Sequence, residues 1–188
     1  MYGLVNRAIE NMIRSQHGDD TWERIRGRAG VQVEMFVGMA SYPDDVSYRL
    51  VGAASEILGR PAHELLEAFG EYWTLYTAEQ GYGDLFRKSG TSFPGFMQNL
   101  HSLHTHVGRL FPNLQPPSFW CTEVTEHSLR LHYQSSRPGL GPMVIGLVRG
   151  LGRMFDTDVT IVADQTREQG AAHDQFLVTF APRARHAR

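Results

Sequence analysis

The strongest constraint on the fold is a change in hydrophobic periodicity near residue 115. Before it, apolar residues recur every three or four positions, as in residues 5–13, 61–76 and 93–111, a spacing typical of amphipathic helices. After it, residues 129–133 alternate, residues 143–155 are again helical, and residues 159–162 and 176–180 resemble strands. Such segregated blocks predict an α+β fold, in which helices pack against a mainly antiparallel sheet.

Proline and acidic residues mark several of the predicted helix boundaries. Asp19 or Asp20 is expected to cap a second helix that ends near Gly30. Pro61 is expected to open a further helix, and Pro112 follows the end of the helix predicted at 93–111. The amino-terminal part is therefore predicted to be helical throughout.

Length and charge limit the classes of protein to consider. With 188 residues, 41% of them hydrophobic, the chain can bury one sizeable core, so we expect a single domain over 1–182 and a basic tail over 183–188. The formal net charge of -2 provides no basic field for nucleic acid. Neither an export signal nor a long apolar run is present, which predicts a soluble, cytoplasmic protein with no membrane partner.

His104 is the first candidate for chemistry. It follows Leu100 by four residues and precedes Val107 by three, so it lies on the apolar stripe of its predicted helix. A neutral imidazole on such a stripe can ligate a metal ion and leave the opposite coordination position open. A hydrogen-bonded core histidine is the alternative.

Two neighbouring histidines raise the possibility of a zinc site. His101 could share a metal ion with His104, but His106 points away from His104, and the H-E-x-x-H arrangement is missing. We therefore expect His101 and His106 to be largely solvated. Cys121, the only cysteine, could be a redox site or an inert small hydrophobe.

The second candidate site is the segment that carries Tyr133, Ser135 and Arg137. These residues alternate, so in an extended segment they point to one face. Arg137 offers a planar fork that suits a carboxylate, and the two hydroxyls can donate to the same anion. The alternative is an edge strand with a solvated arginine.

Together these features resemble the H-NOX family, the haem domains related to that of soluble guanylate cyclase. The Y-x-S-x-R pattern of Tyr133, Ser135 and Arg137 resembles the family's haem-propionate motif, and residues 99–106 resemble its proximal-histidine helix. Residues 1–6, 50–54 and 116–119 are also similar to the family, and the likeness is closest to stand-alone cyanobacterial members.

The resemblance implies how a cofactor is held. Ferrous haem b would lie between an amino-terminal helical distal subdomain (about 1–60) and a carboxy-terminal haem-anchoring subdomain (about 61–182). His104 would be the proximal iron ligand, and the Tyr133, Ser135 and Arg137 side chains would hold the propionates. Pro117 matches the proline that presses on the haem and distorts it, although an ordinary turn is the alternative.

The distal side, by the same resemblance, decides which gas is bound. Oxygen-binding members carry a tyrosine donor where this chain has Met143, whose thioether cannot donate a hydrogen bond. We therefore expect nitric oxide, and also carbon monoxide, as ligands. Trp73 is a second distal candidate because its indole N–H is a donor, unless it is a core aromatic beside Phe69 and Tyr76.

The resemblance predicts a gas sensor and not an enzyme. Weakening of the bond between His104 and iron would signal to a separate partner, such as a histidine kinase or a cyclase. An oxygen-binding haem sensor and a haem-free regulatory module that binds a small carboxylate through Arg137 remain as alternatives.

Overall fold

The computed structural model describes residues 1–77, 83–111 and 114–183 of the chain. The helix-ending Pro112 and the tail residues 184–188 lie outside these ranges. The described chain forms two compact units, Met1–Phe69 and Gly70–Arg188. In the described part, no helix is both long and apolar enough to cross a membrane.

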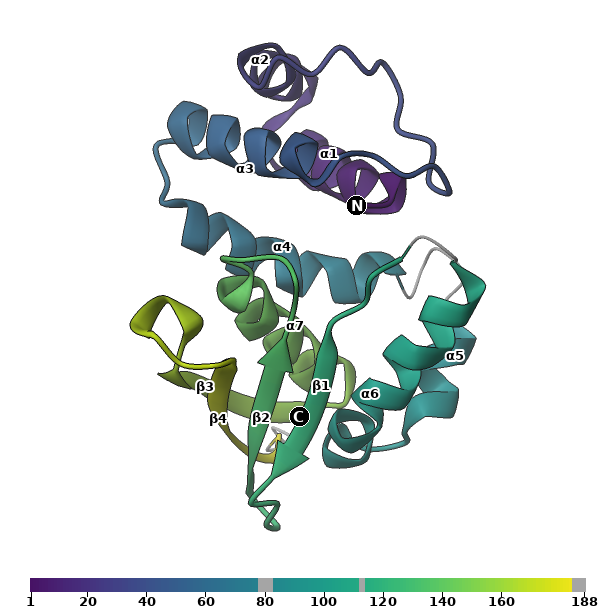
Figure 1. Ribbon diagram of the computed structural model, residues 1–188, viewed down its shortest axis with the longest axis vertical. Helices are drawn as coiled ribbons and strands as arrows, with labels where there is room; N and C mark the ends of the chain where they lie inside the picture. The colour runs from purple at the N-terminus through teal and green to yellow at the C-terminus, as the bar shows by residue number, and fades with distance from the viewer. Residues whose placement is uncertain (78–82, 112–113, 184–188) are drawn as a thin grey trace, which may run out of the picture. The chain divides into compact units, whose positions relative to one another are not determined.

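The first unit is helical, as the periodicity predicts. It contains α1 (Gly3–His17), α2 (Asp19–Arg28), α3 (Asp44–Leu58) and the first part of α4 (Ala62–Thr77) (Figure 1). Helix α1 buries one stripe, which includes Ile9, Met12 and Ile13, and α2 and α3 contribute Trp22, Ile25 and Leu50 to the core. The spacing of the buried residues of α1 is the helical repeat read from the sequence.

The start of α2 differs from the prediction. Its N-cap is Gly18, with φ 86°, and neither predicted aspartate caps the helix with its side chain. Asp19 and Asp20 instead lie in the first turn, where a negative charge interacts favourably with the helix dipole. Gly18 joins α1 directly to α2, because glycine adopts a positive φ without steric cost.

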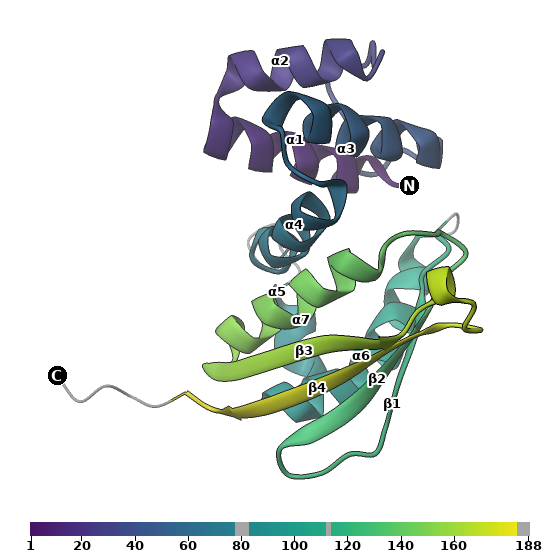
Figure 2. The same ribbon diagram turned by 90° about the vertical axis from the view of Figure 1, so that its left-hand side faces the viewer.

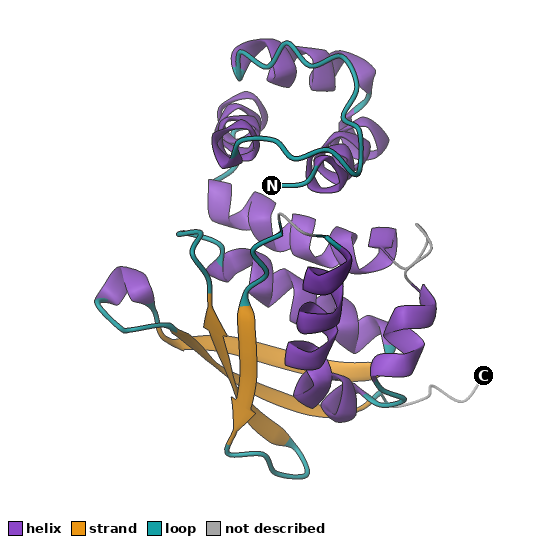
Figure 3. Ribbon diagram, turned by 45° about the vertical axis from the view of Figure 1, so that its right-hand side comes forward, coloured by secondary structure: helices purple, strands orange, loops and turns teal. Residues whose placement is uncertain are grey.

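The second unit contains an antiparallel sheet with the strand order β1-β2-β4-β3 (Figure 3). The strands are β1 (Ser118–Thr122), β2 (Ser128–Gln134), β3 (Thr157–Gln165) and β4 (Asp174–Pro182). The helices are α5 (Gly83–Ser89), α6 (Phe93–Leu110) and α7 (Gly141–Met154), together with the rest of α4. The order of strand, helix, strand, strand that the sequence predicts from residue 129 onward is confirmed, and β1 precedes it.

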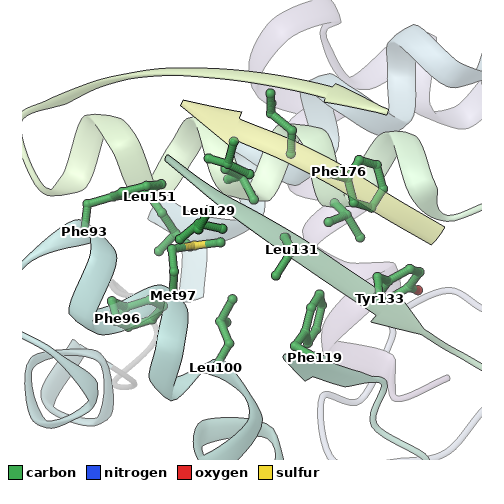
Figure 4. Packing of buried hydrophobic residues seen from close by; sticks show 14 of the residues in the cluster. Phe93, Phe96, Met97, Leu100, Phe119, Leu129, Leu131, Tyr133, Leu151 and Phe176 are labelled. Atoms are coloured by element: carbon green, nitrogen blue, oxygen red, sulfur yellow. The ribbon is translucent and has the colours of Figure 1, made fainter. Parts of the chain in front are cut away.

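Helices α6 and α7 cover the same face of this sheet (Figure 2). Leu129, Leu131 and Tyr133 alternate along β2 and all point into the core, where residues of both helices meet them (Figure 4). The alternation predicted for residues 129–133 therefore sets the buried face of the central strand. At the end of that strand, the core reaches the Y-x-S-x-R segment.

Close helix packing joins α4 to α7. A Cβ atom on Gly70 would lie 2.2 Å from the backbone oxygen of Met143, and one on Gly150 would lie 2.8 Å from the Thr74 hydroxyl oxygen. Only residues without a side chain permit this approach, which brings Met143 next to the turn of α4 that precedes Trp73.

Candidate functional site

His104 is held by its own helix. Its Nδ1 atom lies 2.8 Å from the backbone oxygen of Leu100, one turn earlier in α6. A carbonyl oxygen only accepts, so Nδ1 carries the hydrogen and donates it. In the neutral ring this leaves the lone pair on Nε2, which is the atom free to ligate a metal ion.

Electrostatics favour the neutral form of this ring. Burial lowers the pKa of His104, and the positive potential of the nearby His101 lowers it further, against the opposing effect of the Leu100 carbonyl. An imidazole must be deprotonated to bind a metal ion. The residue therefore has the protonation state, the fixed orientation and the apolar surroundings that an iron ligand needs.

Aromatic rings link His104 to the predicted propionate motif. The ring of Phe119 lies 4.9 Å from that of His104 and 5.1 Å from that of Tyr133, measured between centroids. Phe119 and Tyr133 are directly paired across β1 and β2, so their side chains share a face and lie at one end of the core (Figure 4). The fold thus brings together two motifs that the sequence keeps apart.

The Tyr133 to Arg137 segment is only partly extended. Strand β2 ends at Gln134, and Ser135 and Arg137 lie in the following loop, where the Ser135 hydroxyl accepts a hydrogen bond of 3.1 Å from the Arg137 amide. Exposure still alternates: Tyr133, Ser135 and Arg137 are less exposed than Gln134 and Ser136. The alternation that the spacing predicts is therefore seen in the exposure of these residues, although a loop and not a strand carries the second half of the segment.

Pro117 belongs to a segment held on two sides. The Arg137 Nη1 atom donates to the backbone oxygen of Gln115 at 2.9 Å. On the other side, a Cβ atom on Gly108 would lie 3.3 Å from the Pro116 ring. Because Gly108 follows His104 by one helical turn, this segment lies beside the turn of α6 that carries His104.

Met143 and Trp73 form a second group, on α7 and α4. Both side chains are partly buried, and the Trp73 ring lies 6.3 Å from the ring of the buried Tyr76. The close approach of α4 and α7 at Gly70 puts the two residues on neighbouring turns of packed helices.

Alternative metal sites find no support in the described residues. His101 and His106 are exposed, as expected, and the described part of the chain holds no group of three or more histidine, cysteine or acidic residues arranged for a metal ion. Cys121 is half-buried, its sulfur lies 3.5 Å from the Met97 backbone oxygen, and burial raises its pKa to about 11. A thiol held in this form is a poor nucleophile.

Three further residues take part in the site and were not found from the sequence. Phe119 lies between the His104 and Tyr133 rings, and Gln115 accepts from Arg137 through its backbone. Arg167 donates to the backbone oxygen of Ser135 at 2.7 Å. Any residue type can accept through its backbone oxygen, so Gln115 could not be recognised from its identity. Arg167 lies far from Ser135 in the sequence, so no local pattern links the two.

Comparison with known proteins identifies the family of this chain. The family model described as haem-NO-binding matches residues 2–163. Soluble guanylate cyclase gcy-32 of Caenorhabditis elegans is 33% identical over 92% of this chain, and gcy-35 is 31% identical over 95%. The matches cover only 26% and 27% of those two proteins, so the chain spans about a quarter of their length.

Solved structures share the fold. The H-NOX protein of S. oneidensis in the Fe(II)NO ligation state has a TM-score of 0.87 at 21% identity, with 96% of this chain and 99% of that one covered. The Fe(II) unliganded H-NOX protein of K. algicida has a TM-score of 0.85 at 18% identity, with 100% of both chains covered. Together with the family model, these findings show that the chain belongs to the haem-NO-binding (H-NOX) family, a family of haem-based gas sensors.

Proposed function

We propose that this chain is a nitric oxide sensor that holds ferrous haem b through His104. The observation that carries the proposal is the His104 ring, whose Nδ1 is fixed on the Leu100 carbonyl and whose pKa is lowered by burial, so that Nε2 is available to iron. The haem would supply one open coordination position for a diatomic gas.

The Y-x-S-x-R residues would hold the haem propionates. Arg137 binds the Gln115 carbonyl through Nη1, and the planar fork of a guanidinium suits the two oxygens of a carboxylate. Tyr133 and Ser135 would contribute hydroxyl donors from the same face of the segment. Pro117, in the segment held between Arg137 and Gly108, would press on the haem.

Gas selectivity would follow from the residues on α4 and α7. Met143 has no hydrogen to donate, so bound dioxygen, which is polar, would not receive a stabilising hydrogen bond from residue 143. The binding of nitric oxide and carbon monoxide depends less on such a hydrogen bond. Trp73 is the competing feature, because its indole N–H is a donor. The proposal is that the Trp73 side chain does not stabilise dioxygen.

Signalling would start at His104. If its bond to iron weakens when nitric oxide binds, α6 is released from a restraint at its middle, and a two-state equilibrium shifts. The proposed receiver is a separate signalling protein, such as a histidine kinase or a cyclase. The sensor itself would catalyse no reaction.

The absorption spectrum of the purified ferrous protein tests the proposal. We expect five-coordinate haem that binds nitric oxide and carbon monoxide and forms no stable complex in air. A colourless protein after haem supplementation would contradict haem binding and favour the carboxylate-binding module. A stable oxygenated spectrum would keep the haem, but would contradict the selectivity and point to Trp73.

Replacing Met143 with tyrosine should raise the oxygen affinity of the ferrous protein. The phenol supplies the donor that methionine lacks, and one such hydrogen bond contributes about 1 kcal/mol or more in an apolar pocket, roughly a fivefold gain in oxygen affinity. Oxygen titration of the ferrous variant measures this, with Met143→Phe as the matched control of similar bulk and no donor. Equal oxygen affinity in both variants would show that residue 143 does not face the bound gas.

A further inference from the structure

The connection between β3 and β4 brings a second arginine to the loop that carries Ser135 and Arg137. Arg167 is the first residue of the short 3-10 helix η2 (Arg167–Gln169). Its Nη1 atom donates to the backbone oxygen of Ser135 at 2.7 Å. This contact joins two segments of the second unit that are far apart in the sequence.

The backbone of Arg167 is itself fixed. Its amide donates to Oδ1 of Asp174 at 2.7 Å. Asp174 is 9% exposed, opens β4, and is paired with Tyr133 in the sheet register. The backbone of Arg167 is therefore bonded to β4 at the position where β4 pairs with Tyr133 of β2.

Ser135 needs such a support because the sheet no longer holds it. It follows the last residue of β2, and both of its oxygen atoms are bound by arginines: the hydroxyl accepts from the Arg137 amide at 3.1 Å, and the carbonyl accepts from Arg167 at 2.7 Å. Removing Arg167 would leave the middle residue of the Y-x-S-x-R segment without its carbonyl anchor. It would also remove the positive charge that lies on the Ser135 carbonyl.

We propose that Arg167 is a positioning residue for haem propionate binding, and this rests on the proposed function. It fixes the Ser135 backbone so that the Ser135 hydroxyl and the Arg137 guanidinium face the propionates together, and its charge adds to the attraction for these carboxylates. A positioning effect of this kind depends on the propionates and not on the rest of the haem.

Haem loss to excess apomyoglobin, measured for the holoprotein and for Arg167→Gln, tests this. We expect haem to dissociate roughly fivefold faster from the variant, the factor that corresponds to the net contribution of one typical hydrogen bond. The same measurement with haem dimethyl ester, whose propionates are uncharged, should give equal rates for the variant and the parent. Arg183→Gln is the matched control, because it removes the same charge from the Asp158 pair at the other end of β4.

Each result separates the possibilities. Equal acceleration for haem and its ester, or no acceleration beyond that of Arg183→Gln, would overturn the role of Arg167. The variant Arg137→Gln tests the proposed function in parallel: if it distinguishes haem from the ester while Arg167→Gln does not, only the present inference fails. If Arg137→Gln also loses haem and haem dimethyl ester with equal acceleration, both the propionate assignment and the inference about Arg167 fail.

Discussion

His104→Gly is expected to lower haem affinity at least about a hundredfold, because the loss of a metal ligand costs more than the 10–100-fold that follows loss of an outer partner. The ring that is removed is the one held by the Leu100 carbonyl at 2.8 Å and packed against Phe119. Glycine leaves a space of imidazole size, so added imidazole should enter it and restore the five-coordinate ferrous spectrum. Absorption spectra of the variant with and without imidazole give the measurement.

His101→Gly is the control for this change. It lies one turn earlier in α6, is exposed, and suffers the same loss of helix propensity, about 1 kcal/mol. We expect its haem content and spectrum to equal those of the parent protein. A His104→Gly variant that keeps the parent spectrum without imidazole would show that another residue ligates the iron.

Gly70→Ala is expected to destabilise the second unit by about 3 kcal/mol, as severe overpacking does. The added methyl group would lie 2.2 Å from the Met143 oxygen and 2.7 Å from the Leu147 nitrogen. Both are backbone atoms, which no rotamer change can move aside, so α4 and α7 must separate. Urea unfolding followed by circular dichroism measures the loss of free energy of unfolding.

Gly52→Ala should instead increase the free energy of unfolding. Gly52 is also inside a helix, α3, but a Cβ atom there would meet no heavy atom within 4 Å. Alanine then stabilises the helix by about 0.5–1 kcal/mol, because it loses less backbone entropy on folding. If the two variants were equally stable, the close packing of α4 on α7 would not be a constraint on the fold.

The Gly70→Ala variant should also change gas binding. Separating α4 from α7 would displace Met143 relative to the turn that carries Trp73, and these are the two proposed distal residues. Close packing at Gly70 therefore couples the stability of the second unit to the shape of the proposed gas pocket. A glycine within a helix does not by itself indicate close helix packing, because Gly52 also lies within a helix and has no heavy atom near its Cβ position.

The sequence by itself determined the type and order of most elements and the place of His104 on the apolar side of its helix. Helical and strand periods are local properties of the backbone, so a stripe of apolar residues reveals which side of an element is buried. Local reasoning was wrong where competing caps were available, as at Asp19 and Asp20, because Gly18 could end one helix and begin the next. It could not show that β2 stops at Gln134, inside the Y-x-S-x-R segment.

Only the tertiary structure decided which distant residues meet. Phe119 between His104 and Tyr133, the Gln115 carbonyl on Arg137, and Arg167 on Ser135 all join different elements. Such contacts depend on strand register and on helix packing, which are set by the whole core and leave no periodic trace in the segments they connect. The sequence thus contained the chemical groups of the candidate site, and the packing of the core fixed which of them lie close together.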